Sequence, residues 1–262
     1  MQEERAVKHS VQETEHGKFL LPENDLISDS IRNGSGWDSF LIPIMEMSCD
    51  QNRSAVDAGA NIGFHSVHMS RKFRQVLSFE PQKMIFYNLC ANLLLNNCDN
   101  VSAHNQALFS YAARMDLAPR HLQDVEVPSI GSRIDYDRFN NFGAVAFDVS
   151  SSAGDVSAMP IDSFIEADIG FIKSDCQGLD FPVLLGASQV ISRSRPVVIF
   201  ESELHLESAR GISRADYTKF FSQFSYVLAI TRGDLSSKQA DYLAVPKERA
   251  STFENLLKHK II

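Results

Sequence analysis

The chain has 262 residues, and 44% of them are hydrophobic, so it can bury a sizeable core as one large domain or one domain with an extension. The net charge of -8 argues against nucleic acid or an anionic membrane as the main partner, because both attract clustered Lys and Arg. The N-terminus lacks the apolar core of a signal peptide, and no apolar stretch is long enough to span a bilayer. We therefore expect a cytoplasmic protein with no membrane span and no nucleic-acid partner.

Residues 1–50 are predicted to form an N-terminal arm and a lead-in helix ahead of the main domain. Residues 1–35 are polar and weakly periodic, with Pro and Gly breaks, which is typical of an arm or a loosely packed cap. From Trp37 the apolar residues follow helical spacing until Pro43, which predicts a short helix leading into the first strand. Trp37 is expected to anchor this segment on the sheet, with a substrate platform as the alternative.

Residues 56–65 read Val-Asp-Ala-Gly-Ala-Asn-Ile-Gly-Phe-His and are the most informative stretch of the chain. A short apolar run ends at Asp57, Gly59 and Gly63 bracket a turn, and helical spacing follows. Such a strand, turn and helix N-terminus present unpaired backbone N–H groups, and glycines let a ligand approach the main chain. This pattern predicts a nucleotide-type binding element.

The spacing and charge of this element narrow the choice of nucleotide. No Gly-Lys-Ser/Thr follows it, and glycines four apart do not form the G-x-G-x-x-G of a dinucleotide site. Asp57 would repel phosphates and favour a cationic ligand, and S-adenosylmethionine is such a ligand, with a sulfonium, an ammonium and no phosphate. Glu80 ends the next strand 21 positions after Gly59, the spacing typical of a carboxylate that holds a ribose diol. Taken alone, Asp57 could be a helix cap and Glu80 a solvated strand end.

The main domain is predicted to cover residues 51–262. Strands and helices alternate along it, which predicts a doubly wound α/β fold. The expected helices cover about 62–73, 82–96, 179–192, 214–224 and 248–259, and the expected strands 101–108, 114–119, 145–150, 156–161, 169–175, 195–201, 226–230 and 241–245. The helix at 82–96 is expected to turn these residues toward the sheet: Met84, Tyr87, Leu89, Leu93 and Leu94. Residues 119–145 are irregular, which is typical of an insertion that acts as a lid or of a mobile surface loop.

Polar residues end several apolar strands, and the ligand crevice of such a fold lies at the carboxyl ends of its strands. The crevice is therefore predicted to hold Asp57, Glu80, Asn105, Asp175 and Glu201. The polar end of the strand at 101–108 is also expected to hydrogen-bond an adenine edge.

Two observations argue against a metal site. His65 and His68 lie three apart and share a helix face, but no acidic or cysteine ligand follows at the spacing of a metal-binding helix. The four cysteines lack C-x-x-C spacing and are predicted to be reduced thiols.

The chain resembles the FkbM family of S-adenosylmethionine-dependent O-methyltransferases, from about residue 37 to 245. The segments that carry the resemblance occur in this order: 56–65, Ser-Phe-Glu-Pro at 78–81, Asn88 with Asn96, Asn-Gln-Ala-Leu at 105–108, Ile-Asp-Ser-Phe at 161–164, Phe-Ile-Lys-Ser-Asp-Cys-Gln-Gly at 171–178, and Arg-Pro-Val-Val-Ile-Phe-Glu at 195–201. The resemblance implies a class I methyltransferase (Rossmann-like) fold with a mostly parallel, seven-stranded sheet.

The resemblance also implies where the cofactor binds. Its methionine and ribose side would be lined by Asp57, Gly59, Asn61 and Gly63, and Glu80 would take the ribose hydroxyls. The remaining predicted cofactor residues are Ala60, Pro81, Asn105, Gln106 and Asp175.

One motif departs from the family pattern. The family usually has Asp-x-Glu-Gly where this chain has Asp175, Cys176, Gln177 and Gly178, so an amide replaces a carboxylate. Any catalytic or metal-binding role of that carboxylate is weakened here, although Asp180 keeps an acidic position nearby. The change leaves open a catalytically silent relative that only binds or scaffolds.

The expected activity is O-methylation of a hydroxyl on a sugar or another small-molecule or natural-product acceptor. Because the sulfonium is already activated, the protein must align the acceptor oxygen and help remove its proton. Asp175 is the first candidate for acceptor binding or base, with a helix cap as its alternative, and Glu201 and His205 are the second. A divalent metal held by these three residues is a less favoured alternative. The alternative enzyme class is a nicotinamide-dependent oxidoreductase, which would share the fold but would need a different glycine pattern. The sequence does not identify the methyl acceptor, and it leaves a homo-oligomer as one option for the oligomeric state.

Overall fold

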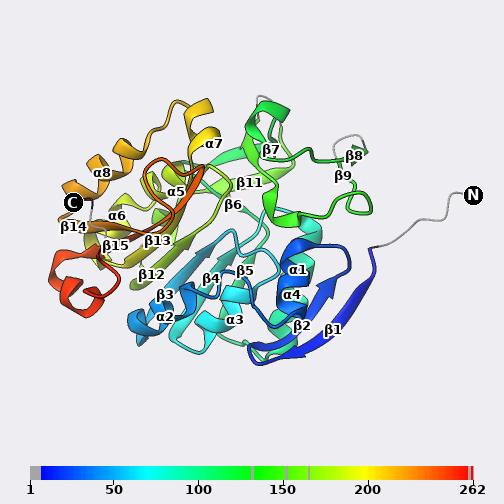
Figure 1. Cartoon of the computed structure of the whole chain (residues 1–262), viewed down its shortest axis with the longest axis horizontal. Helices are drawn as coiled ribbons and strands as arrows, with labels where there is room; N and C mark the ends of the chain where they lie inside the picture. Colours follow the sequence, from blue (N-terminus) through cyan, green and yellow to red (C-terminus); the bar gives the residue numbers. More distant parts are fainter. Residues whose placement is uncertain (1–6, 131–132, 151–152, 165, 259–260, 262) are drawn as a thin grey trace, which may run out of the picture.

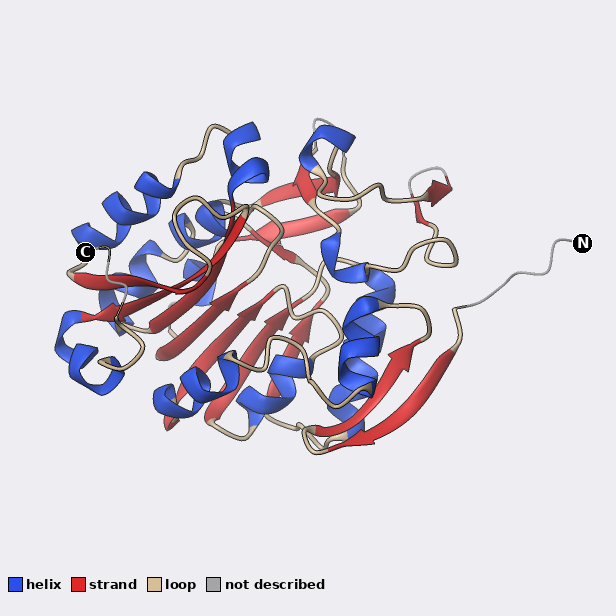
Figure 2. Cartoon of the chain, in the orientation of Figure 1, coloured by secondary structure: helices blue, strands red, loops and turns tan. Residues whose placement is uncertain are grey.

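The computed structural model describes residues 7–130, 133–150, 153–164, 166–258 and 261. A seven-stranded sheet forms the centre, with helices packed on both of its faces (Figures 1 and 2). An N-terminal hairpin and a small four-stranded sheet lie beside it. No helix within these ranges is long and apolar enough to cross a bilayer.

The central sheet has the strand order β14-β15-β13-β12-β3-β4-β5. Its strands are β3 (Asp50–Ala58), β4 (Phe73–Phe79), β5 (Val101–His104), β12 (Ile169–Ser174), β13 (Val197–Glu203), β14 (Tyr226–Arg232) and β15 (Gln239–Pro246). The five strands from β13 to β5 are parallel, whereas β15 runs antiparallel to both β13 and β14. The sheet is therefore mixed, and its seven strands agree with the class I methyltransferase fold that the resemblance implies.

Both faces of the sheet are buried, because apolar residues alternate to either side of each strand. One face packs against α2 (Leu41–Ser48), α3 (Phe64–Ser70) and the 3₁₀ helix Lys247–Phe253. The other packs against α5 (Asp180–Leu185), α6 (Ser188–Ser194) and α8 (Arg214–Gln223). On β3, for example, Ala55 lies in the first of these two apolar clusters and Val56 in the second. This is the doubly wound architecture predicted from the sequence.

Residues 9–32 form regular elements rather than the arm or loose cap that the sequence predicted. Strands β1 (His9–Thr14) and β2 (Gly17–Pro22) form a hairpin, and α1 (Leu26–Arg32) follows it. Phe19 and Leu21 on β2 are fully buried. The polar composition that suggested a loose segment belongs mainly to β1, whose residues are largely exposed.

Helix α4 (Lys83–Leu95) turns a face toward its neighbours that differs in part from the expected one. Leu89 and Leu93 are buried as predicted. The prediction was wrong for three residues that are more than half exposed: Met84, Tyr87 and Leu94. Asn88 and Asn92 are buried instead, because their amides bond to the backbone carbonyls of Leu20 and Ile62.

Three predicted elements are divided or changed in type. The strand at 101–108 breaks at Asn105, so β6 (Ala107–Leu108) joins the small sheet formed with β10 (Phe147–Val149), β7 (Ala113–Leu117) and β11 (Val156–Met159). The helix at 179–192 breaks at Gly186, where a Cβ would lie 2.2 Å from the carbonyl oxygen of Phe109. The C-terminal segment forms 3₁₀ turns rather than an α-helix, and residue 259 lies outside the described residues.

The described residues of the 119–145 segment form short elements: the 3₁₀ helices Arg120–Leu122 and Phe142–Ala144, and the paired strands β8 (Ser129–Ile130) and β9 (Arg133–Ile134). Phe139 and Phe142 are buried in the apolar cluster that also holds Ile27 of α1. The insertion is therefore packed against the N-terminal segment.

The turn after β3 brings two strand ends into close contact. Gly59 has a φ of +73°, and a Cβ at this position would lie 1.9 Å from the carbonyl oxygen of Asp175. Gly63 has a φ of +89° and precedes α3. These two conformations and the close approach explain why both turn positions are glycine.

Gly59→Ala should destabilise the protein far more than Gly211→Ala. Gly211 has the same φ of +73°, but a Cβ added there would meet nothing within 4 Å, so this change costs only the backbone strain of about 1–2 kcal/mol. Gly59→Ala adds a clash with backbone and should cost a further ~2 kcal/mol or more. Urea denaturation of both variants measures the difference, and equal losses would contradict the close approach.

Candidate functional site

A cavity of about 330 Å³ opens at the carboxyl ends of β3, β4, β12 and β13. Eight of the predicted site residues line it: Gly59, Ala60, Asn61, Glu80, Pro81, Gln106, Asp175 and Glu201. Four do not line it: Asp57, Gly63, Asn105 and His205. The cavity therefore gathers most of the predicted residues at the predicted edge of the sheet.

Glu80 is held on the cavity wall by the glycine turn. The backbone N–H of Asn61 donates to Glu80 Oε2 (2.9 Å), and that of Gln82 donates to Oε1 (2.8 Å). Burial raises the pKa of Glu80 to about 7, although these two hydrogen bonds oppose the rise. Asn105 does not line the cavity but holds the backbone next to Glu80, because its side-chain amide donates to the carbonyl oxygens of Glu80 and Pro81.

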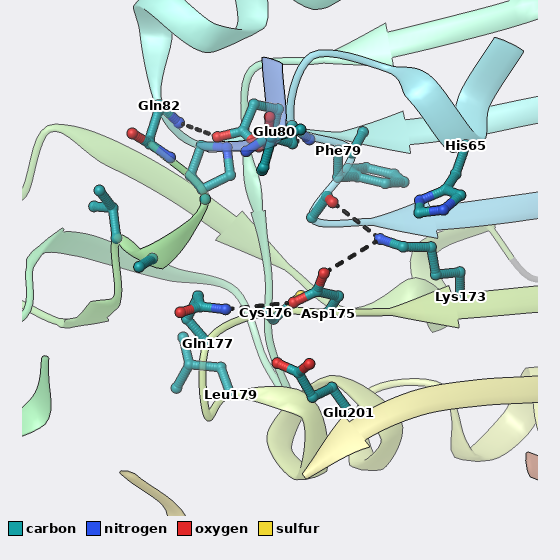
Figure 3. Close-up of a pocket in the computed structure, with 18 of the residues that line it drawn as sticks. His65, Phe79, Glu80, Gln82, Lys173, Asp175, Cys176, Gln177, Leu179 and Glu201 are labelled. Atoms are coloured by element: carbon teal, nitrogen blue, oxygen red, sulfur yellow. Dashed lines mark hydrogen bonds and ion pairs between the residues drawn. The ribbon is translucent and has the colours of Figure 1, made fainter. Parts of the chain in front are cut away.

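Asp57 lies beneath the cavity, where it binds Lys173 rather than facing a ligand (Figure 3 shows Lys173 with its cavity neighbours). Asp57 is fully buried, its Oδ1 lies 3.2 Å from Lys173 Nζ, and its Oδ2 accepts from the hydroxyl of Ser66 (2.6 Å). The ammonium also donates to the carbonyl oxygen of Gly59 (3.1 Å). Burial alone would lower the pKa of Lys173, but the carboxylates of Asp57 and Asp175 outweigh it and raise that pKa.

Lys173 was not among the predicted site residues, although a signal was available. It stands in a strand whose six residues are all buried. A lysine in such a strand requires a buried carboxylate partner. Parallel pairing of β12 with β3 places Lys173 opposite Asp57.

Asp175 follows β12 directly and points into the cavity beside Lys173, Gln177 and Glu201 (Figure 3). Its Oδ2 lies 3.9 Å from Lys173 Nζ, and its Oδ1 accepts from the side-chain amide of Gln177 (3.4 Å). Burial raises the pKa of Asp175, while Lys173 lowers it. The helix-cap alternative fails, because the N-cap of α5 is Leu179 and has no side-chain cap.

Glu201 and Glu203 end β13, and both line the cavity. The side-chain amide of Gln239 donates to Glu201 Oε1, whereas Oε2 of each glutamate is buried with no hydrogen-bond partner among the described residues. Burial and nearby acids raise the pKa of Glu201 well above its usual value and that of Glu203 to about 8. Glu203 was missed because the strand was predicted to end at Glu201, two residues earlier.

His205 lies outside the cavity lining and meets the insertion instead. Its Nε2 is 2.9 Å from Oδ1 of Asp124, a cavity residue from the 119–145 segment. Lys238 also pairs with Asp124. This contact connects α7 (Leu204–Ala209) with the insertion.

Within the described part of the chain, no group of three or more His, Cys, Asp or Glu side chains is arranged to hold a metal ion. His68 bonds the carbonyl oxygen of Phe64 through Nδ1 (2.9 Å) and lies 3.2 Å from His16 Nδ1 through Nε2. Burial lowers the pKa of His65 to about 3 and that of His68 to about 4. Both rings are therefore neutral at pH 7 and pack inside the protein.

Comparison with known proteins gives a consistent set of similarities. The family model described as the Methyltransferase FkbM domain matches residues 57–242, most of the chain. Two fungal proteins are each 42% identical over a short stretch: "Methyltransferase 1" of Beauveria bassiana over 55 residues, and "Methyltransferase sdnD" of Sordaria araneosa over 69. These matches cover 20% and 25% of this chain, and only 22% and 27% of the two relatives.

Solved structures of methyltransferases are also similar. Methyltransferase FkbM from Methylobacillus flagellatus is 19% identical, with 74% of this chain and 44% of that one covered and a TM-score of 0.48. A putative methyltransferase from Streptococcus mutans, solved in complex with SAH, is 11% identical, with 79% and 96% covered and a TM-score of 0.47.

Lys173→Met should destabilise the protein by about 3–5 kcal/mol, because it leaves the carboxylate of Asp57 buried without its cation. Lys72→Met is the matched control. Lys72 pairs with Glu46 over the same 3.2 Å but at the surface, so its loss should cost at most ~1 kcal/mol. Urea denaturation measures both, and the double variant Asp57→Asn/Lys173→Met should lose less than the sum of its single changes. Similar losses in the two lysine variants would contradict the buried pair.

The stability of the protein should fall as pH rises from about 5 to 8. The pKa of Glu203 is about 8 in the folded protein against its usual 4.5, so the folded state holds a proton that the unfolded state has lost in this window. In Glu203→Gln the free energy of unfolding should fall less steeply with pH, by at most about 1.4 kcal/mol per pH unit. Some pH dependence should persist in this variant, because the pKa values of Glu80 and Asp180 are also raised.

Thermal unfolding across this pH range measures the effect, with Glu254→Gln on the exposed surface as the control. The control should follow the wild-type curve. A Glu203→Gln curve that also follows it would show that Glu203 is not held in its protonated form.

Proposed function

The chain belongs to the FkbM methyltransferase family, and from that premise we propose that it transfers the methyl group of S-adenosylmethionine to a hydroxyl of a sugar or other small-molecule acceptor. One observation carries the proposal. The glycine turn at Gly59, the buried carboxylate of Glu80 and the carboxylate of Asp175 line a single cavity. The cavity therefore combines a main-chain turn for the cofactor with two carboxylates. Glu80 would accept hydrogen bonds from a ribose diol, and Asp175 would accept a proton.

The residues present fit S-adenosylmethionine better than a dinucleotide. Six carboxylates line the cavity, against one lysine and one arginine. Such a surface favours a sulfonium and an ammonium and disfavours a pyrophosphate. This charge distribution is the main argument against a nicotinamide cofactor.

Individual residues would hold different parts of the cofactor. Glu80 has both oxygens fixed by backbone N–H groups, so their remaining lone pairs are available to the two ribose hydroxyls. Gln106 lines the cavity past the end of β5 and would contact the adenine edge. Asp57 would act indirectly, by fixing Lys173 and through it the carbonyl of Gly59.

The chemistry needs few further groups. The bound cofactor supplies a methyl already activated by the sulfonium. The acceptor oxygen would take this methyl in exchange for the carbon–sulfur bond, and S-adenosylhomocysteine would be the leaving group. Asp175 or Glu201 would accept the hydroxyl proton, because both carboxylates line the cavity and burial raises the pKa of each, which makes each a stronger base.

The amide that replaces the family's carboxylate at Gln177 has a structural role in this chain. It donates to Oδ1 of Asp175, a bond that an ionised glutamate cannot make. Asp175 therefore keeps a hydrogen-bonded orientation without the second carboxylate. The silent relative remains an outcome of the experiment below.

Calorimetric titration should show micromolar binding of S-adenosylmethionine and no binding of NAD. Glu80→Ala should weaken the binding at least 100-fold, because it removes the acceptor for both ribose hydroxyls. Glu254→Ala, an exposed glutamate, should bind as the wild type does. Binding of NAD, or of neither compound, would refute the proposal. Binding of S-adenosylmethionine without methyl transfer to any hydroxylated compound in a broad screen would favour the silent relative.

A further inference from the structure

The cavity has more carboxyl groups than its own cations and backbone N–H groups match. Six carboxylates line it: Asp38, Glu80, Asp124, Asp175, Glu201 and Glu203. Four of them are matched within the described residues. Asp38 pairs with Arg232, Asp124 with Lys238, Asp175 with Lys173, and Glu80 accepts two backbone N–H groups.

Glu201 and Glu203 are the exceptions. Neither forms an ion pair with any residue that the structure describes, and each has an Oε2 that is buried without a hydrogen-bond partner. Their exposed fractions are only 5% and 6%. Burying an ionised carboxylate with no partner is costly, so the pair ionises fully only when a ligand supplies positive charge.

The two glutamates are positioned as a pair. They stand two residues apart on β13 and therefore project from the same face of the sheet. Glu203 occupies the N-cap position of α7, but its side chain does not cap the helix. Helix capping therefore does not explain why a glutamate stands here. In Figure 3 the Glu201 carboxylate points into the cavity below Asp175.

Two arginines, Arg232 and Arg210, lie near the pair, and neither forms an ion pair with it. Arg232 binds Asp38 and Asp241. Arg210 is close enough for its charge to interact with Glu203, but it makes no ion pair with that glutamate. Its two Nη atoms donate to the carbonyl oxygens of Leu206 and Phe147, and its Nε is buried without a hydrogen-bond partner among the described residues. No cation among the described residues pairs with Glu201 or Glu203, so a bound ligand is the source of positive charge that we consider.

An ammonium fits the pair better than a metal ion. Among the described residues, no group of three or more His, Cys, Asp or Glu side chains is arranged to hold a metal ion, so a metal at this pair would take most of its ligands from water. A protonated amine has three N–H donors and can give one to each free Oε2. The ammonium of the cofactor is a less suitable source, because β12 separates β13 from β3, whose end carries the glycine turn.

We infer that the methyl acceptor carries a protonated amine, which Glu201 and Glu203 bind while a neighbouring hydroxyl faces Asp175. The acceptor class is then an amino sugar or amino alcohol, and proton removal falls to Asp175. This inference rests on the proposed function, since it names the substrate of the same cavity.

The test compares binding of matched amines and amides to the whole chain saturated with S-adenosylhomocysteine. The probes are glucosamine, galactosamine and 3-amino-1,2-propanediol, each with its N-acetyl derivative, which keeps the hydroxyls and removes the charge. Ligand-detected NMR titration should give at least one amine a Kd tenfold or more below that of its N-acetyl partner. In Glu203→Gln the ratio should fall to about one, whereas Glu254→Gln should keep it.

Each result separates the inference from the function on which it rests. If no amine binds more tightly than its N-acetyl partner, or if Glu203→Gln keeps the preference, the inference is wrong. If Glu203→Gln weakens S-adenosylmethionine itself tenfold or more, the pair serves the cofactor, and the inference is again overturned. Failure of the proposed function would appear earlier, as an absence of S-adenosylmethionine binding in the wild type.

Discussion

The buried ion pair between Asp57 and Lys173 is the interaction on which the site depends. It joins the carboxyl ends of β3 and β12 at the cavity, which Lys173 lines, and Lys173 also donates to the carbonyl oxygen of Gly59. The turn at Gly59 in turn lies against the backbone of Asp175 with no room for a side chain. One lysine therefore fixes the relative position of the glycine turn and of the proposed proton acceptor. Buried pairs often add little stability, so we interpret this one mainly as a positioning device.

The carboxylates on the two sides of the cavity differ in their hydrogen-bond partners. On the side of β4, Glu80 has both oxygens fixed by backbone N–H groups and is prepared to accept from a neutral diol. On the side of β13, Glu201 and Glu203 have buried oxygens without partners among the described residues. The first arrangement suits a ribose, and the second suits a cation. The proposed cofactor and the proposed amine-bearing acceptor would thus occupy opposite ends of one cavity, with Asp175 between them.

The sequence predicted the fold and the Glu80 side of the cavity more fully than the Glu203 side. Glu80 could be placed because a parallel sheet brings strand ends together and because its spacing from Gly59 follows that geometry. The partnership of Asp57 with Lys173 was missed, since it depends on register across β3 and β12. Asp124 comes from an irregular segment, and β13 runs two residues further than its apolar pattern, so Glu203 was overlooked. Periodicity reports burial along one element, whereas these residues are brought together by packing between elements.

The most direct measurement is a crystal structure of the protein with S-adenosylhomocysteine. Both ribose hydroxyls should lie within about 3 Å of the Glu80 carboxylate, with the sulfur facing Asp175 and open space between that sulfur and Glu201 for the acceptor. A ligand bound outside this cavity, or one whose ribose lies away from Glu80, would refute the proposed cofactor site.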